Sequence, residues 1–145
     1  MANDRFAGPV DFLVFVFDEH ADLGTGLVAL LERVESGLIE ILDIEFVARG
    51  ADGGAVKRAI ADLDGITGVD LRVFEGVESG VLDAVDLAAI AAELHRGQVA
   101  LAIVYEDRSL AAAAEAWVTV GGAELFSGGV DIADLESALE ERKPA

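Results

Sequence analysis

The sequence contains no cysteine, and this absence excludes several kinds of chemistry at once. Without thiols the chain forms no disulfide, no thiolate zinc site and no thiol nucleophile. Basic residues are also scarce, because 10 Lys and Arg stand against 28 Asp and Glu and give a formal net charge of −18. Since Lys and Arg neutralise the phosphates in nucleic-acid complexes, we expect no direct binding to DNA or RNA.

Long apolar runs are missing as well, although 53% of the residues are hydrophobic. No run approaches the roughly 18 to 20 residues that a membrane-spanning helix needs. The N-terminus also lacks the apolar stretch and small-residue cleavage site of a secretory signal. The sequence therefore predicts a cytoplasmic protein without a membrane span, whose acidic surface favours solubility and attracts basic partners or cations.

What is present is a pattern of short strands and amphipathic helices in a chain whose length fits one domain. Residues 10–17 (VDFLVFVF) form a continuous apolar run that predicts a buried strand, and residues 99–105 predict another strand with two apolar faces. Alternation predicts a strand over 38–48, followed by a turn at Asp52-Gly53-Gly54 and a hairpin partner at 56–60.

Helix signals occur four times along the chain. Apolar residues at spacings of three and four, with capping residues or glycines at the ends, predict helices over 23–34, 83–94, 110–120 and 131–142. Ser109 and Asp131 are the expected N-caps of the last two helices. A short strand is expected at 124–126, and residues 61–82 form a variable excursion with one strand at 69–74.

The alternation over 38–48 assigns side chains to two faces. One face is expected to hold Leu38, Leu42, Ile44 and Phe46, and the other Ile39, Ile41, Asp43, Glu45 and Val47.

The order of these elements predicts an α/β (α+β) fold in a single domain over residues 1–145. Its sheet and helices come from 8–60 and 83–128, and the first six elements match the split β-α-β pattern of a ferredoxin-like sheet with an added C-terminal α-β-α extension. Such a sheet carries helices on one face, yet the strands at 10–17 and 99–105, expected at its centre, are apolar on both. Either the helices at 110–120 and 131–142 or another subunit must cover the second face.

A set of short motifs extends from the start of the chain to its end. They are Gly8-Pro9-Val10-Asp11-Phe12-Leu13-Val14, Gly37, Leu42-Asp43, Phe46-Val47, Asp52-Gly53, Leu94, Gly97, Ala100, Glu106, Gly121-Gly122, Leu125 and Gly128. With these motifs the chain resembles a bacterial family of small acidic proteins that has no assigned reaction.

The chain resembles more distantly a group of predicted membrane proteins with a glycine-rich apolar hairpin between the third strand and the second helix. Here residues 65–82 take that place, and they are too short and too charged to insert in a bilayer. Members of the first family often carry a tryptophan shortly after the position of Glu106. This chain has Asp107-Arg108-Ser109 there, so the resemblance implies no role for Trp117.

The densest polar cluster follows the first predicted strand and comprises Asp18, Glu19, His20 and Asp22. Loops at this place in α/β proteins commonly hold ligands, and carboxylates with an imidazole can coordinate a divalent cation. An acidic loop before a helix also stabilises that helix through its dipole, without any ligand. The four residues are therefore the candidates for a metal site, with the dipole as the competing explanation.

Four further features have simpler structural explanations. Gly24-Thr25-Gly26 lacks dinucleotide spacing and a P-loop lysine, so it indicates a tight turn. Asp62-Leu63-Asp64-Gly65 resembles the start of a calcium loop but lacks the later ligands. The helix dipole accounts for His95, and Trp117 is most simply an anchor in the core or in an interface.

No nucleophile–base pair, metal triad or cofactor motif stands out, so we expect no catalytic residue and no cofactor. The two-faced apolar strands predict a non-catalytic interaction module that self-associates as a homo-oligomer, most simply a dimer. The last helix is expected to cover the exposed sheet face or to take part in the assembly. The alternative is a sensor of a small ligand or a divalent cation, with its site near residues 18–22 and 65–82.

Overall fold

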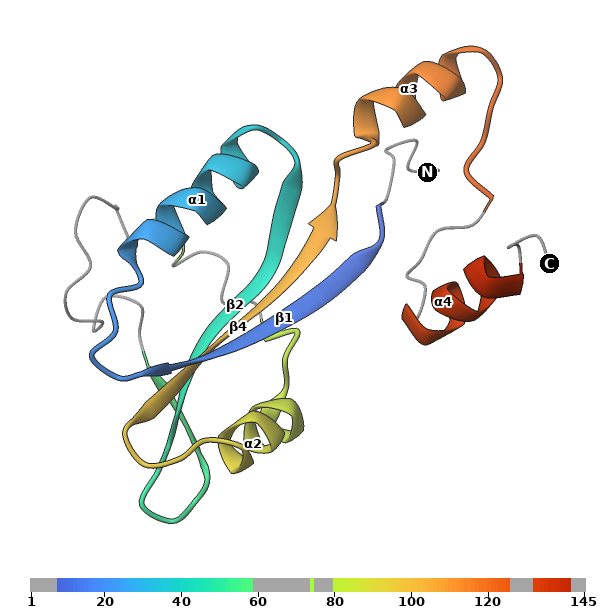
Figure 1. Cartoon of the computed structure of the whole chain (residues 1–145). Helices are drawn as coiled ribbons and strands as arrows, with labels where there is room; N and C mark the ends of the chain where they lie inside the picture. Colours follow the sequence, from blue (N-terminus) through green and yellow to red (C-terminus); the bar gives the residue numbers. More distant parts are fainter. Residues whose placement is uncertain (1–7, 59–73, 75–79, 126–131, 142–145) are drawn as a thin grey trace.

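The computed structural model describes residues 8–58, 74, 80–125 and 132–141 (Figure 1). Within them the chain forms an α+β fold with one antiparallel sheet, which confirms the predicted class. The elements in chain order are β1 (Val10–Asp18), α1 (Gly24–Glu35), β2 (Ile39–Arg49), β3 (Ala55–Arg58), α2 (Ala84–Ala92), β4 (Gln98–Asp107), α3 (Ala111–Thr119) and α4 (Ile132–Glu141).

Several predictions fall wholly or partly outside these residues, among them the turn at Asp62-Leu63-Asp64-Gly65 and most of the excursion at 61–82. The strand expected at 69–74 lies outside the described residues except for Phe74, and Asp131, the expected cap of the last helix, lies outside them entirely. Of the strand expected at 124–126, Glu124 and Leu125 are described, and neither is in a strand.

The strand order is β1-β4-β2-β3, and every neighbouring pair is antiparallel. β4 lies between β1 and β2, so the central strands are β4 and β2. The expectation that residues 10–17 form a central strand is wrong, because β1 lies at the edge. The predicted ferredoxin-like arrangement is not confirmed by this order.

A bulge in β2 changes which of its side chains share a face. Tyr105 of β4 pairs with Ile41 and its neighbour Val104 pairs with Asp43, so Leu42 is an extra residue in the ladder. The extra residue brings Ile41 onto the same face as Ile44, and both lie in one core cluster. The strict alternation predicted over 38–48 is therefore wrong across Leu42.

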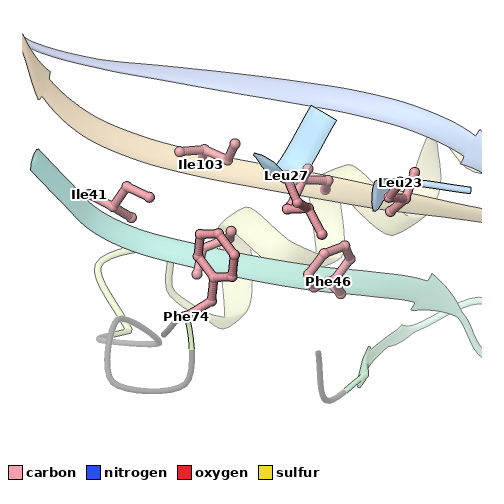
Figure 2. Close-up of a cluster of buried hydrophobic side chains, with 8 residues drawn as sticks. Leu23, Leu27, Ile41, Phe46, Phe74 and Ile103 are labelled. Atoms are coloured by element: carbon pink, nitrogen blue, oxygen red, sulfur yellow. The ribbon is translucent and has the colours of Figure 1, made fainter. Parts of the chain in front are cut away.

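The main core lies between α1 and one face of the sheet (Figure 2). Its buried members are Leu23, Leu27, Ile41, Ile44, Phe46, Phe74, Leu101 and Ile103. A smaller cluster joins Val47 to Leu87 and Ala91 of α2. Because the neighbours Phe46 and Val47 point to opposite faces of β2, α1 and α2 cover opposite faces of the sheet.

The cap of α2 explains why this helix begins where it does. Asp83 Oδ1 accepts from the backbone N–H of Asp86 at 2.9 Å, and Asp86 Oδ2 accepts from the N–H of Asp83 at 3.1 Å. Each carboxylate thus satisfies an N–H that the first helical turn leaves unpaired.

The two C-terminal helices do not cover the sheet. The helices packed on it are α1 and α2, and Figure 1 shows α3 and α4 lying away from both faces. α3 has no buried residue. Its N-cap is Leu110 without a side-chain hydrogen bond, so the expected cap by Ser109 is wrong. The proposal that these helices cover the second face is therefore wrong, and the possibility of another subunit stands.

Candidate functional site

The acidic loop singled out in the sequence leads from the end of β1 into α1. Glu19 Oε1 lies 3.5 Å from His20 Nε2, and Glu19 Oε2 lies 3.8 Å from an Arg58 guanidinium nitrogen. Asp22 Oδ1 accepts from the N–H of Gly24 at 2.9 Å, at the start of α1. Asp18 is exposed at the last position of β1.

These contacts do not assemble a ligand set. Among the described residues, no three His, Asp or Glu side chains gather closely enough to hold a metal ion. The hydrogen bond of Asp22 satisfies the backbone N–H of Gly24, at the start of α1. This role is consistent with the competing explanation, in which the acidic loop stabilises the helix without a ligand. The cation site at Asp18, Glu19, His20 and Asp22 stays a prediction.

Among the residues that the structure describes, β1 carries six exposed apolar side chains in one strand. Phe12 is 73% exposed and Phe15 52%, although both lie within a nine-residue strand. We call the exposed apolar side chains of this strand the β1 surface: Val10, Phe12, Leu13, Val14, Phe15 and Val16. Successive side chains of a strand point to opposite faces, so this surface lies on both faces of the sheet.

On the α1 face the β1 surface adjoins an open apolar groove of about 460 Å³. Leu13 and Phe15 line it from β1, Leu27 and Leu30 from α1, and Leu101 and Ile103 from β4. The groove exists because α1 packs over β2, so it leaves the side chains of β1 uncovered. On the opposite face Val14 lies beside Ala102 of β4 in the register of the ladder, and α2 packs farther along, on β2 and β3.

The outer edge of β1 has no strand partner within the described part of the chain. Two backbone hydrogen bonds show which residues direct their N–H and C=O groups toward β4. The Pro9 carbonyl accepts from the N–H of Asp107 at 2.8 Å, and the N–H of Glu19 donates to the Gly97 carbonyl at 2.9 Å. In an antiparallel strand alternate residues direct both backbone groups to the same side. The backbone N–H and C=O groups of the odd-numbered residues of β1 therefore point toward β4. Those of the even-numbered residues point to the open edge, and these residues are Val10, Phe12, Val14, Val16 and Asp18.

Two buried carboxylates, those of Asp43 and Glu45, lie on β2, and the predicted alternation did not indicate their burial. Asp43 Oδ2 accepts from the N–H of Leu82 at 2.8 Å and so holds the segment that enters α2. Glu45 Oε2 lies 3.5 Å from Lys57 Nζ of β3. Both groups connect β2 to the elements that cover it, which is a structural role.

The start of β1 is held against the end of β4. Glu106 pairs with Arg108, and Glu106 Oε1 accepts from the N–H of Gly8 at 3.3 Å. A side chain at Gly8 would overlap the carbonyl oxygen of Asp107, so only glycine fits there. Hydrogen bonds from the side chain and then the backbone of Ser109 hold the pKa of the Asp107 carboxyl below its usual value.

α3 and the residues after it present a second set of exposed apolar side chains. Trp117 is 61% exposed, so the interpretation of this residue as a core anchor is wrong and its role in an interface stays a prediction. Val118, Val120 and Leu125, which follow Trp117 in the sequence, are exposed as well.

No helix in the described ranges is both long and apolar enough to cross a membrane. No family model, curated protein or solved structure matches this chain. The resemblance to the bacterial family of small acidic proteins therefore stays a prediction.

Proposed function

We propose that this protein is a non-catalytic interaction module that self-associates through β1. The observation that carries the proposal is an edge strand whose apolar side chains are exposed on both faces. Full burial of a Val, Leu or Phe side chain stabilises by about 1.5–3 kcal/mol, a large amount against a domain stability of roughly 5–15 kcal/mol. A chain that keeps six such side chains in one exposed strand gains most by burying them against a partner.

The exposed area supports the same conclusion. A phenylalanine side chain buries on the order of 150–250 Å², so Phe12 at 73% exposure presents roughly 110–180 Å² on one face and Phe15 at 52% roughly 80–130 Å² on the other. Apolar patches above a few hundred Å² mark interaction sites in soluble proteins. Val10, Leu13, Val14 and Val16 add to these two rings, so the β1 surface and its neighbouring groove together offer an apolar centre for the proposed interface, which buries about 800 Å² per partner in stable complexes.

Among the described residues the other edge of the sheet is β3, which differs from β1 in length and in charge. The described part of β3 is four residues long, and two of them are the cations Lys57 and Arg58. Short length and charge are the usual means of keeping an edge strand from pairing. β1 is longer and has no charged residue between Asp11 and Asp18, which supports β1 as the side that associates.

Size-exclusion chromatography with light scattering tests the proposal. The wild-type chain is expected at twice its 15.1 kDa mass, and Phe12→Lys at the monomer mass because it places a charge in the β1 surface. Val120→Lys is the matched control, since Val120 is 83% exposed outside β1, and this variant is expected to remain a dimer. A wild-type monomer across the micromolar range would reject the proposal.

The apolar groove favours a second candidate function, binding of a small apolar ligand. Its volume of about 460 Å³ lies within the range of about 300–1,000 Å³ that ligand sites occupy. This function is tested by thermal unfolding with a panel of apolar ligands. If it is correct, at least one ligand raises the unfolding temperature while the chain stays monomeric. A flat panel together with a dimeric mass favours self-association.

A further inference from the structure

The proposed self-association has a specific geometry if β1 itself is the contact. We infer that two copies pair β1 with β1 in antiparallel orientation across a two-fold axis at Val14, which joins two four-stranded sheets into one of eight strands. This inference rests on the proposed function and assigns its partner, a second copy of this chain, residue by residue.

The backbone determines which residues pair. The groups that point away from β4 belong to the even-numbered residues of β1, such as Phe12, Val14 and Val16. A two-fold axis perpendicular to the sheet pairs each residue with one of the same face, so an even-numbered residue meets an even-numbered one. Val14 on the axis then lies opposite Val14 of the second copy, Phe12 lies opposite Val16, and Val10 lies opposite Asp18.

This register uses the whole strand. With Val14 on the axis, all nine residues of β1 have a partner in the ladder. If the axis moves to Leu13 or Phe15, even-numbered residues still pair with even-numbered ones. Two residues of each β1 then extend beyond the end of the other strand and have no partner. The Val14 register therefore forms the longest ladder that two copies of β1 can make.

Charge favours the same register. Asp11 and Asp18 are the acidic residues of β1, and with Val14 on the axis they lie opposite Phe17 and Val10 respectively. Asp11 and the Asp18 of the other copy come near each other along the ladder but point to opposite faces, because one position is odd and the other even. With Phe15 on the axis, Asp11 would lie directly opposite Glu19, and opposed like charges destabilise a strand pair.

The side chains pair on both faces. Leu13 meets Phe15 of the second copy on the α1 face, and Phe12 meets Val16 on the other face, so both faces of the β1 surface gain apolar cross-strand neighbours. Because the axis is perpendicular to the sheet, both α1 helices lie on the same side. The two apolar grooves then meet across the axis, with Leu13 and Phe15 of both copies on their common floor.

The chain has no cysteine, so a single cysteine introduced by mutation reports the register through the disulfide that it forms. Val14→Cys lies opposite itself, at the roughly 5.5 Å between Cα atoms of a hydrogen-bonded pair, within the range of a disulfide. Phe12→Cys is the matched control, because its copy lies four residues along the ladder, at about 14 Å. Phe12 is also more exposed than Val14, at 73% against 36%, so random collisions would favour the control.

Mild oxidation followed by a non-reducing gel is expected to convert most of Val14→Cys to a covalent dimer and only a trace of Phe12→Cys. Mixing Phe12→Cys with Val16→Cys is expected to restore the crosslink, which tests the register even if Val14→Cys folds poorly. A wild-type dimer in light scattering without either crosslink would overturn the register while leaving self-association intact. A wild-type monomer would reject both, and would indicate that another segment of the same chain covers β1.

Discussion

β1 and β2 flank the same strand, β4, and both are rich in apolar residues, yet their surroundings differ completely. β2 has β3 along its second edge, α1 over one face and α2 over the other, and Ile44 and Val47 on its two faces have no exposed area. In the described part of the chain β1 has no strand along its second edge, α1 and α2 pack on β2 rather than on β1, and every residue of β1 except Phe17 is exposed. The apolar pattern of a strand therefore predicts that it is buried, but does not show which part of which chain buries it.

The largest expected effect is the difference in stability between the Phe46→Ala and Phe12→Ala variants. Phe46→Ala in β2 should lower the free energy of unfolding by about 3–5 kcal/mol, because it removes a fully buried ring from the main core. Phe12→Ala in β1 should change the stability of the monomer by less than about 1 kcal/mol, since its ring is exposed there. Urea denaturation at a protein concentration that keeps both variants monomeric measures the difference, and equal losses would show that β1 is buried within its own chain.

A second prediction concerns β3, which covers the edge of β2 and supplies a cation to it. Lys57→Met should lower the free energy of unfolding by about 1–3 kcal/mol, because it takes a cation away from the buried carboxylate of Glu45. Arg58→Met is the matched control, since its partner Glu19 is exposed, and its effect should stay within about 0.5 kcal/mol. Thermal unfolding of the two variants ranks them, and the opposite order would contradict the assigned role of Lys57.

The smallest effect is expected at Asp107, at the end of β4, where β1 and β2 begin. The pKa of its carboxyl is lowered in the folded state by Ser109, so this contact stabilises the fold above the unfolded-state pKa of about 3.9 and is lost as pH falls through the folded-state pKa. Ser109→Ala should raise the pKa of Asp107 toward its ordinary value while the backbone hydrogen bond remains. A carboxyl NMR titration measures the change, and an unmoved pKa would contradict the assigned cause.

Local patterns in the sequence were sufficient for most of the helices and strands. The spacing of Leu27, Leu30, Leu31 and Val34 predicts α1, and the run at 10–17 predicts β1 almost to the residue. The candidate loop is placed correctly between them. These features depend on neighbours within a few positions, which a periodic pattern reports directly.

What could not be predicted depends on partners far away in the chain. β4 follows β1 by some 80 residues and pairs beside it, and nothing in residues 10–17 shows that the strand's other side stays open. The bulge at Leu42 is visible only as a shift against Tyr105 and Val104. The buried carboxylate of Asp43 likewise finds its partner at Leu82, 39 positions away. The one available signal was that residues 10–17 are apolar on both faces.

The hydrogen bonds at Pro9 and Glu19 hold β1 at both of its ends, and the ladder to β4 holds it between them. A strand fixed in this way need not become ordered when it binds, whereas a disordered peptide pays about 1–2 kcal/mol for each residue it orders. The remaining obstacle to encounter is the repulsion between two bodies of net charge −18, which acts over a Debye length of about 8 Å at physiological ionic strength. For the proposed dimer, dissolved salt is therefore expected to control how quickly two copies meet, and the contacts of β1 how long they stay together.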